Sequence, residues 1–130
     1  MEPTAEQFAA LSGSPHDGQV VMLNLLRFKD RATGIDEADQ ITGAEAYVRY
    51  GAQARRCLER AGGRILLALS PHESVIGPVP GEWDLVLAVE YPSRQAFLAM
   101  IGDPVYLAAH EHRAAGVVDS RLVACSALPA

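Results

Sequence analysis

The stretch GEWDLVLAVEYPSRQAFLAM, residues 81–100, contains the patterns of a strand, a turn and a helix in direct succession. Residues 82–91 are rich in branched and aromatic apolar side chains, which is typical of a strand. Pro92 ends that pattern, and Ser93 stands directly before an apolar helical repeat, where its hydroxyl can cap the helix. This stretch therefore predicts a strand that turns at once into a capped helix.

Similar patterns lie on both sides of this stretch. Strands are predicted at residues 19–29, 64–70 and 120–128, and helices at residues 3–11, 43–61, 94–102 and 104–116. With the strand at 82–91, the order is strand, helix, strand, strand, helix pair, strand. This order predicts an α+β fold of the ferredoxin-like type, a split β-α-β with a four-stranded antiparallel sheet and its helices on one face.

The helix at 43–61 has the clearest boundaries. Thr42 and Glu45 have the spacing of a capping box, in which each side chain accepts a hydrogen bond from the other residue's backbone N–H. The paired glycines at 62–63 end the helix. A stripe with helical spacing is predicted to face the sheet, and it consists of Tyr47, Gly51, Ala54 and Leu58.

Length, composition and charge limit the classes of protein. A chain of 130 residues with 49% hydrophobic and 21% charged residues predicts a single globular domain over 1–130, with residues 1–18 as an N-terminal helical extension. A net charge of -5 without a basic stripe argues against nucleic acid as a partner. Because no signal peptide and no membrane-spanning stretch is recognisable, we expect a cytoplasmic protein with no membrane partner.

The predicted arrangement leaves one face of the sheet uncovered. Helices on a single side would leave Val, Leu, Met and Ala side chains of the strands exposed on the other side. Such an apolar face of several hundred square ångströms is unfavourable in a soluble monomer. We therefore expect a homodimer, in which two sheets pair through their open faces and form an eight-stranded barrel.

Several segments in order along the chain resemble a known family. They are VVMLNLLRFKD, GAEAYVRYG, GGRILLA, VIGP, EWDLVLAVEYPSRQAFLAMIGDPVYLAAHEHR and DSRLVA. This combination, which extends from residue 20 to about residue 124, resembles the domain of unknown function 1330 family (DUF1330) of the dimeric α+β barrel superfamily. The resemblance implies the fold and the dimer. It implies little about chemistry, because the superfamily contains monooxygenases, haem-degrading proteins, cyclases and isomerases.

Two polar residues are candidates for a pocket between the sheet and its helices. Asn24 shares a strand face with apolar neighbours, so its amide must find a partner there. That partner is either a substrate or nearby backbone and water. Tyr47 can turn its ring to the core and its hydroxyl to a cavity, and the alternative role for it is core packing alone.

Trp83 and Asp84 are candidates at the start of the strand at 82–91. In a regular strand they point to opposite faces, so they cannot both line one pocket. Trp83 is expected to form a wall of the site or to pack on a helix. Asp84 is expected among apolar neighbours, where its pKa would rise and suit a general base. The alternative is an ion pair with an arginine such as Arg64 or Arg113.

The sequence HEHR is the densest titratable cluster. On a helix, His110 is in register with Tyr106 and Arg113, whereas His112 points about 200° away from His110, so the two cannot chelate one metal. The resemblance places His112 and Arg113 in the HR motif of the family. A histidine there could take a proton as general base while arginine holds the resulting anion. In the alternative, Arg113 only forms an ion pair with Asp84 or Glu111.

No phosphate-binding loop, dinucleotide fingerprint or nucleophile elbow occurs in the sequence, and no cofactor or metal is expected. We expect a cofactor-independent enzyme that acts on a small enolisable or aromatic metabolite. Its base would be His112 or Asp84, and its substrate-binding residues would be Asn24, Tyr47, Trp83 and Arg113. The alternative is a non-catalytic dimer that binds a small molecule or has a structural role.

Overall fold

The computed structural model describes residues 2–34 and 40–129 of the chain. Its elements are α1 (Ala5–Ser12), β1 (Val20–Phe28), α2 (Gly43–Arg60), β2 (Arg64–Leu69), β3 (Leu85–Tyr91), α3 (Arg94–Ile101), α4 (Pro104–Gly116) and β4 (Val117–Cys125). Within these described stretches, no helix has the length and apolar character needed to cross a membrane.

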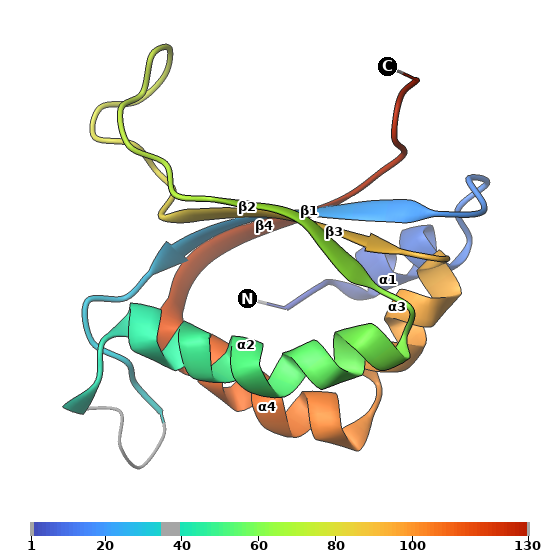
Figure 1. Ribbon diagram of the computed structural model, residues 1–130, viewed down its shortest axis with the longest axis horizontal. Coiled ribbons are helices and arrows are strands. Elements are labelled where there is room, and N and C mark those ends of the chain that lie inside the picture. The colour runs from blue at the N-terminus through green and yellow to red at the C-terminus, as the bar shows by residue number, and fades with distance from the viewer. Residues whose placement is uncertain (1, 35–39, 130) are drawn as a thin grey trace.

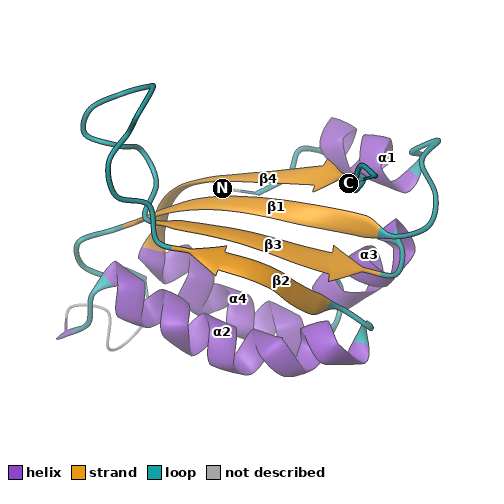
Figure 2. Cartoon of the chain, turned by 45° about the horizontal axis from the view of Figure 1, so that its top comes forward, coloured by secondary structure: helices purple, strands orange, loops and turns teal. Residues whose placement is uncertain are grey.

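The strands form one sheet in the order β2-β3-β1-β4, and every neighbouring pair is antiparallel. Helices α2 and α4 lie side by side along one face of this sheet, as Figure 1 shows, and α1 and α3 lie near one of its ends (Figure 2). The opposite face carries no helix. The predicted order of elements and the ferredoxin-like α+β fold are confirmed.

Strand β1 shows how the sheet separates its two faces. Val20, Met22 and Leu26 point toward the helices and are at most 2% exposed, because they belong to the core or lie directly beside it. The residues between them, Leu23 and Leu25, face the other side and are only half-buried. Because both faces are apolar, the strand reads as an unbroken hydrophobic run in the sequence.

Small residues allow α2 and α4 to approach closely where α2 begins and α4 ends. Gly43 and Gly116 are both buried, and a side chain at either would meet backbone atoms of the neighbouring segment. The backbone of Lys29 joins the two ends, because its N–H donates to Gly116 O at 2.8 Å and its carbonyl accepts from Gly43 N at 3.1 Å. Ala46 is completely buried at this crossing.

Helix α2 begins as predicted, but its capping box is only half formed. Glu45 N donates to Thr42 Oγ1 at 3.1 Å, whereas the Glu45 carboxylate accepts from the Thr42 hydroxyl at 3.2 Å rather than from its backbone N–H. A complete box occurs instead between Thr4 and Gln7 at α1. After α2, Gly62 has the positive φ of 79° that favours glycine and ends the helix.

The predicted stripe of α2 faces the sheet as expected, but its two large side chains are less buried than predicted. Tyr47 faces the sheet, since its ring lies 5.3 Å from that of Phe28. Tyr47 and Leu58 are nevertheless only half-buried, and the fully buried residues of the helix are Gly43, Ala46, Ala54 and Cys57. The reason is that α2 packs against α4 as well as the sheet, so its most buried stripe is turned toward the neighbouring helix.

Candidate functional site

Three tyrosines form an aromatic cluster between the sheet and the helices. Tyr47 and Tyr50 come from α2, with ring centroids 5.2 Å apart, and Tyr106 comes from α4. The hydroxyls of Tyr50 and Tyr106 lie 2.9 Å apart and share a hydrogen bond. Tyr47 also contacts Phe28 of β1, so the cluster extends from the sheet to α4. It places phenol groups beside the inner face of the sheet.

Burial keeps these hydroxyls protonated. Desolvation raises the pKa of Tyr47 to about 12 and raises the pKa values of Tyr50 and Tyr106 as well. The nearby charge of Arg113 acts against this rise and lowers the pKa of all three. Arg113 follows Tyr106 by seven residues on α4, which is about two helical turns. At neutral pH, the cluster presents neutral hydroxyls, and α4 carries one fixed positive charge at Arg113.

Arg113 is half-buried on α4 and lines a cavity of about 50 Å³. The other lining residues are Glu2, His110, Ala114 and Val117. Among residues 2–34 and 40–129, no carboxylate forms an ion pair with Arg113, and the bridges to Asp84 or Glu111 that the sequence left open are not seen. A partly desolvated guanidinium without an anion is an unusual arrangement for a purely structural arginine.

His110 and His112 occupy different sides of α4. His110 lies in the cavity with Arg113; its ring centroid is 6.1 Å from that of Tyr106, and its Nε2 is 2.7 Å from Glu2 Oε1. His112 is not among the lining residues of this cavity. Its spacing from buried Ala109 and Gly116 directs it toward the contact between α4 and α2. The cavity beside Arg113 is therefore lined by His110 and not by His112.

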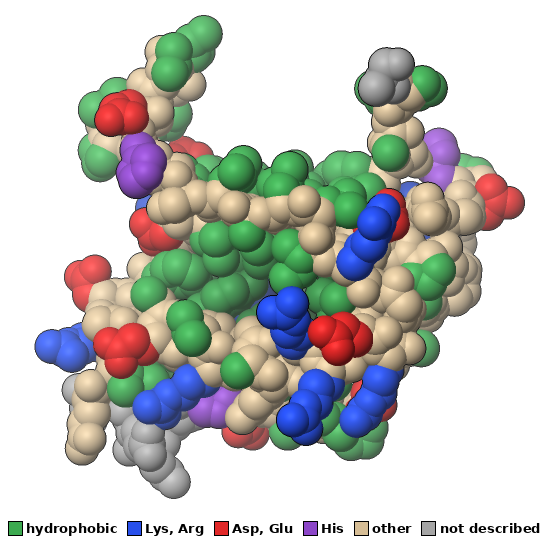
Figure 3. Space-filling view, viewed as in Figure 1, with side chains coloured by type: hydrophobic (Ala, Val, Ile, Leu, Met, Phe, Trp, Pro, Cys, Tyr) green, Lys and Arg blue, Asp and Glu red, His purple; other side chains and the backbone are tan. Residues whose placement is uncertain are grey.

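Asn24 lies on the helix-facing side of β1, directly opposite Leu87 on β3 and Leu122 on β4. Its Nδ2 donates to the Met22 carbonyl at 3.2 Å, so one backbone partner is present. Leu122 remains 44% exposed although it faces the helices. At the opposite edge of the sheet, Figure 3 shows hydrophobic side chains gathered between β2 and helix α2.

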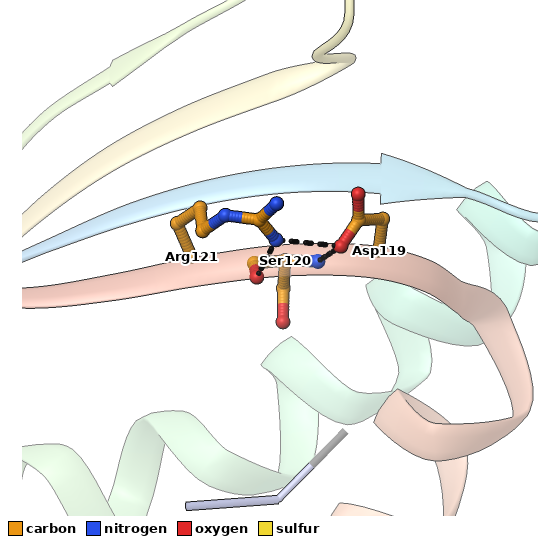
Figure 4. Close-up of polar contacts among 3 residues, drawn as sticks. All are labelled: Asp119, Ser120 and Arg121. Carbon is orange, nitrogen blue, oxygen red and sulfur yellow. Dashed lines mark hydrogen bonds and ion pairs between the residues drawn. The ribbon is translucent and has the colours of Figure 1, made fainter. Parts of the chain in front are cut away.

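Trp83 lies on the other side of the sheet. The guanidinium of Arg121 lies 5.4 Å from the centre of its ring. In Figure 4, Arg121 and Asp119 of β4 point away from the helices, whereas Ser120 points toward them. Arg121 is also held by Asp119 at 2.7 Å. Trp83 thus forms part of the open face rather than a wall of the tyrosine site.

Asp84 precedes β3 and has a structural contact. Its Oδ2 accepts a hydrogen bond from Phe28 N at 2.9 Å, and its own N–H donates to Leu26 O at 2.7 Å. The side chain is exposed and is not surrounded by the apolar neighbours that the strand pattern predicted. The expected partner Arg64 pairs instead with Glu90 at 3.0 Å. Any catalytic role of Asp84 stays a prediction.

The predicted residues therefore divide into two groups. Asn24, Tyr47 and Arg113 lie on the helix-facing side of the sheet. Trp83 and Asp84 have their contacts elsewhere, with Arg121 and with the Phe28 backbone, and His112 does not line the cavity beside Arg113. The site also contains Tyr50, Tyr106, His110 and Glu2. Tyr50 stands three residues after Tyr47 on one helix, and Tyr106 and His110 are in helical register with Arg113, so the sequence carries a signal for these three. No local pattern connects Glu2 with this site.

Solved structures show the same fold. A crystal structure of methylated RPA0582 protein is 42% identical in sequence, with a TM-score of 0.92 over 98% of this chain and 94% of that one. RPA0582 from Rhodopseudomonas palustris, described as a protein of unknown function, is 41% identical with a TM-score of 0.91 and covers 99% and 97%. Among curated proteins, none matches the chain.

More distant structures support the fold alone. A dabb family protein with a ferredoxin-like fold from Mesorhizobium loti has 13% identity and a TM-score of 0.55, over 86% of this chain and 99% of that one. A protein from Bacteroides fragilis, described as dimeric and ferredoxin-like, has 15% identity and a TM-score of 0.51, over 82% and 94%. The sequence profile of the domain of unknown function DUF1330 matches residues 34–126. The chain belongs to the DUF1330 family.

Proposed function

We propose that this protein is a homodimer that binds a small, partly apolar, enolisable or aromatic metabolite between its sheet and helices, with a polar oxygen of the ligand at Arg113. The observation that carries the proposal is the half-buried Arg113 guanidinium, which lines a cavity together with His110 and has no carboxylate partner among the described residues. An anionic or strongly polarised ligand oxygen would complete its hydrogen bonding.

The ligand's apolar part has a place next to this charge. The rings of Phe28 and Tyr47 and the half-exposed Leu122 offer apolar and aromatic contacts on the inner face of the sheet. Asn24 lies opposite Leu122, and no described residue donates to its side-chain oxygen. A flat ligand could thus be bound by rings on its faces and by Arg113 and Asn24 at its edge.

The open face of the sheet supports the homodimer. Its central row consists of Leu67, Ala88, Leu23 and Val123, one residue from each strand. Leu67 is 43% exposed and Val123 is 48% exposed in the single chain. A second copy of the same face would bury this row by a symmetrical contact, which is the commonest way for identical chains to associate.

Two segments flank that face and have the shape of arms. In Figure 1, the segment between β2 and β3 and the last described residues both extend beyond the sheet, on the side without helices. The first carries Val75 and Ile76, which are 93% and 97% exposed, and the second carries Leu128, which is 87% exposed. Large apolar side chains at this exposure are unfavourable in isolation. A second subunit between the arms would cover them.

Cofactor-independent catalysis on the same ligand is a second candidate. The observation that favours it is that Nδ1 of His110 and Nδ1 of His112 are buried without a hydrogen-bond partner among the described residues. As predicted from the sequence, His112 would accept a proton from an acidic C–H or phenol O–H of the ligand. The electron pair left behind would form an enolate or phenolate, whose oxygen Arg113 would stabilise, and the proton would return in the reverse step.

A ligand screen by thermal shift tests the binding proposal. Enolisable and aromatic metabolites that raise the melting temperature of the wild type should have reduced effects on Arg113→Gln and Asn24→Ala. Arg55→Gln is the control, because it removes an exposed arginine of α2 that pairs only with Glu59 in the following turn. If both site variants retain the shifts undiminished, the ligand does not bind at this site.

Deuterium exchange tests the catalytic candidate on the same ligands. An enzyme with a general base should catalyse the exchange of the ligand's acidic C–H for C–D in heavy water, as followed by NMR. We expect the exchange to be lost in His112→Ala, with His16→Ala, an exposed histidine before β1, as the matched control. Unchanged exchange in His112→Ala would remove this residue from the role of base.

A further inference from the structure

Glu2 is the feature of the cavity that the proposed function does not use. Its side chain enters from the segment before α1 and lines the cavity together with His110 and Arg113. Glu2 Oε1 lies 2.7 Å from His110 Nε2, which is the distance of a strong hydrogen bond. The two residues are separated by 108 positions in the chain. A carboxylate of the protein itself thus forms part of the cavity wall and takes the hydrogen bond of His110.

The carboxylate of Glu2 contacts only one of the two basic side chains in the cavity. Glu2 reaches His110 but forms no ion pair with Arg113, although all three residues line one cavity. Its side chain is 66% exposed, whereas that of His110 is 24% exposed. Because an exposed ion pair contributes little to stability, this contact can be exchanged for another at small cost. The side chains of His110 and Arg113 are more buried than that of Glu2, so they are the more fixed residues of the cavity.

We propose that the space between His110 and Arg113 is a subsite for the carboxylate group of the ligand, and that Glu2 occupies it in the unliganded chain. This inference rests on the proposed binding function and adds the chemical class of the ligand, a small monocarboxylate with an apolar or aromatic body. The ligand carboxylate takes the hydrogen bond of His110 Nε2 and pairs in addition with the guanidinium that Glu2 leaves without a partner.

The size and chemistry of the subsite favour a carboxylate. The cavity of about 50 Å³ holds a group of a few atoms and no complete metabolite, so the body of the ligand must extend toward the tyrosine rings. A planar carboxylate matches the guanidinium fork of arginine and leaves one oxygen lone pair for an imidazole N–H. The phenol of Tyr106 lies on this path, next to His110.

Glu2 then competes with the ligand for one position. A ligand binds only to the fraction of molecules in which Glu2 has moved away from His110. Its apparent affinity is therefore the intrinsic affinity multiplied by that fraction. If Glu2 occupied the subsite about nine-tenths of the time, removing its charge would raise the affinity by about tenfold. Removing the charge of a nearby glutamate outside the subsite would leave the affinity for the ligand unchanged.

Calorimetric titration with benzoate, and with benzamide as the neutral isostere, tests the inference on the full chain. Glu2→Gln should bind benzoate about tenfold more tightly than the wild type. Glu6→Gln is the matched control, because it removes the same charge from an exposed position of α1. Arg113→Gln should weaken benzoate binding by roughly tenfold to a hundredfold, the effect of a hydrogen bond to a charged group. In the wild type and in Glu2→Gln, benzamide should bind at least about tenfold more weakly than benzoate, and Arg113→Gln should reduce this difference.

The outcomes separate this inference from the proposed function. Equal benzoate affinity in the wild type and Glu2→Gln, or an equal gain in Glu6→Gln, would overturn the role of Glu2. Tighter binding of benzamide than of benzoate would overturn the carboxylate subsite, and so would an absence of benzoate binding in all variants. In either case, the proposed binding function would still hold if neutral ligands raise the melting temperature of the wild type and do so less in Arg113→Gln. The chemical shifts of the His110 imidazole should change when benzoate is added to the wild type, and they should also differ between the wild type and Glu2→Gln.

Discussion

At the scale of single residues, the protein uses burial to keep its phenols neutral. All four tyrosines of the chain have pKa values raised by desolvation, and three of them meet in the candidate site. The fourth, Tyr91, belongs to the core and donates to the Met100 sulfur at 3.8 Å. Neutral hydroxyls can donate to a ligand oxygen, which tyrosinates could not do. The positive charge of the site therefore comes from Arg113 and from any proton on His110.

The pH dependence of stability follows from these tyrosines. An unfolded tyrosine ionises near pH 10, whereas the pKa of Tyr47 is about 12 in the fold. Below pH 10 the stabilisation is complete, and it is lost as pH rises from 10 through about 12, because only the unfolded chain releases its protons there. We expect native protein to show little tyrosinate absorbance at pH 10 to 11, and unfolding at higher pH to release it. Full tyrosinate absorbance in native protein near pH 10 would contradict the buried cluster.

At the scale of elements, the contact between α2 and α4 positions the site. The pair Tyr47 and Tyr50 on one helix meets Tyr106 on the other only because the two helix axes are close. Glycine and alanine at the point where α2 begins and α4 ends permit this approach. The site therefore depends on residues that take no part in its chemistry.

Glycine substitutions test this dependence. A methyl group at Gly43 would lie less than 3.0 Å from backbone atoms of Lys29 and Gly116, which cannot move aside easily. We expect Gly43→Ala to lower the free energy of unfolding by about 1–3 kcal/mol or more, the usual cost of overpacking. Gly51→Ala in the same helix is the control. Nothing lies within 4 Å of its added methyl, so it should stabilise by about 0.5–1 kcal/mol. Urea denaturation measures both, and equal effects would contradict the tight crossing.

At the scale of the whole molecule, the helices cover one face of the sheet and leave the other apolar and open. The sheet thus separates a helix-covered side, with the tyrosines and Arg113, from an open side, with the row Leu67, Ala88, Leu23 and Val123. The guanidinium of Arg121 lies over the Trp83 ring at the edge of the open side. If the homodimer forms there, Trp83 belongs to its surroundings rather than to the ligand site.

Charge substitutions on the open face test the dimer. We expect the wild type to sediment as a dimer and Leu67→Asp and Val123→Asp to sediment as monomers. Both side chains are over 40% exposed in the single chain, so a protomer loses little when they change, whereas a buried unpaired carboxylate between two sheets would be costly. Val48→Asp on α2, 70% exposed on the helix side, should remain dimeric. A monomeric wild type, or a monomeric Val48→Asp, would argue against pairing through the sheet.

Local signals in the sequence predicted the architecture well. The helix cap at Ser93 is present, with Ala96 N donating to its hydroxyl at 3.0 Å, and Asp103 caps α4 through Val105 N at 2.7 Å. Caps, prolines and apolar runs act over a few residues, so they can be read along the chain. The separate sides of α4 for His110 and His112 also follow from helical periodicity. Which of those sides faces the tyrosines does not follow from it.

The amino-acid sequence by itself determined the order of elements, the antiparallel sheet and its uncovered apolar face, because alternation, capping and turn residues are local and the commonest connections between them are few. Tertiary structure alone decided the site. It placed His110 and Glu2 in hydrogen-bond contact across 108 positions and in one cavity with Arg113, and it gave Trp83 and Asp84 contacts elsewhere. Contacts of this kind depend on how two helices cross and how one segment threads between layers, and no short stretch of sequence contains that information.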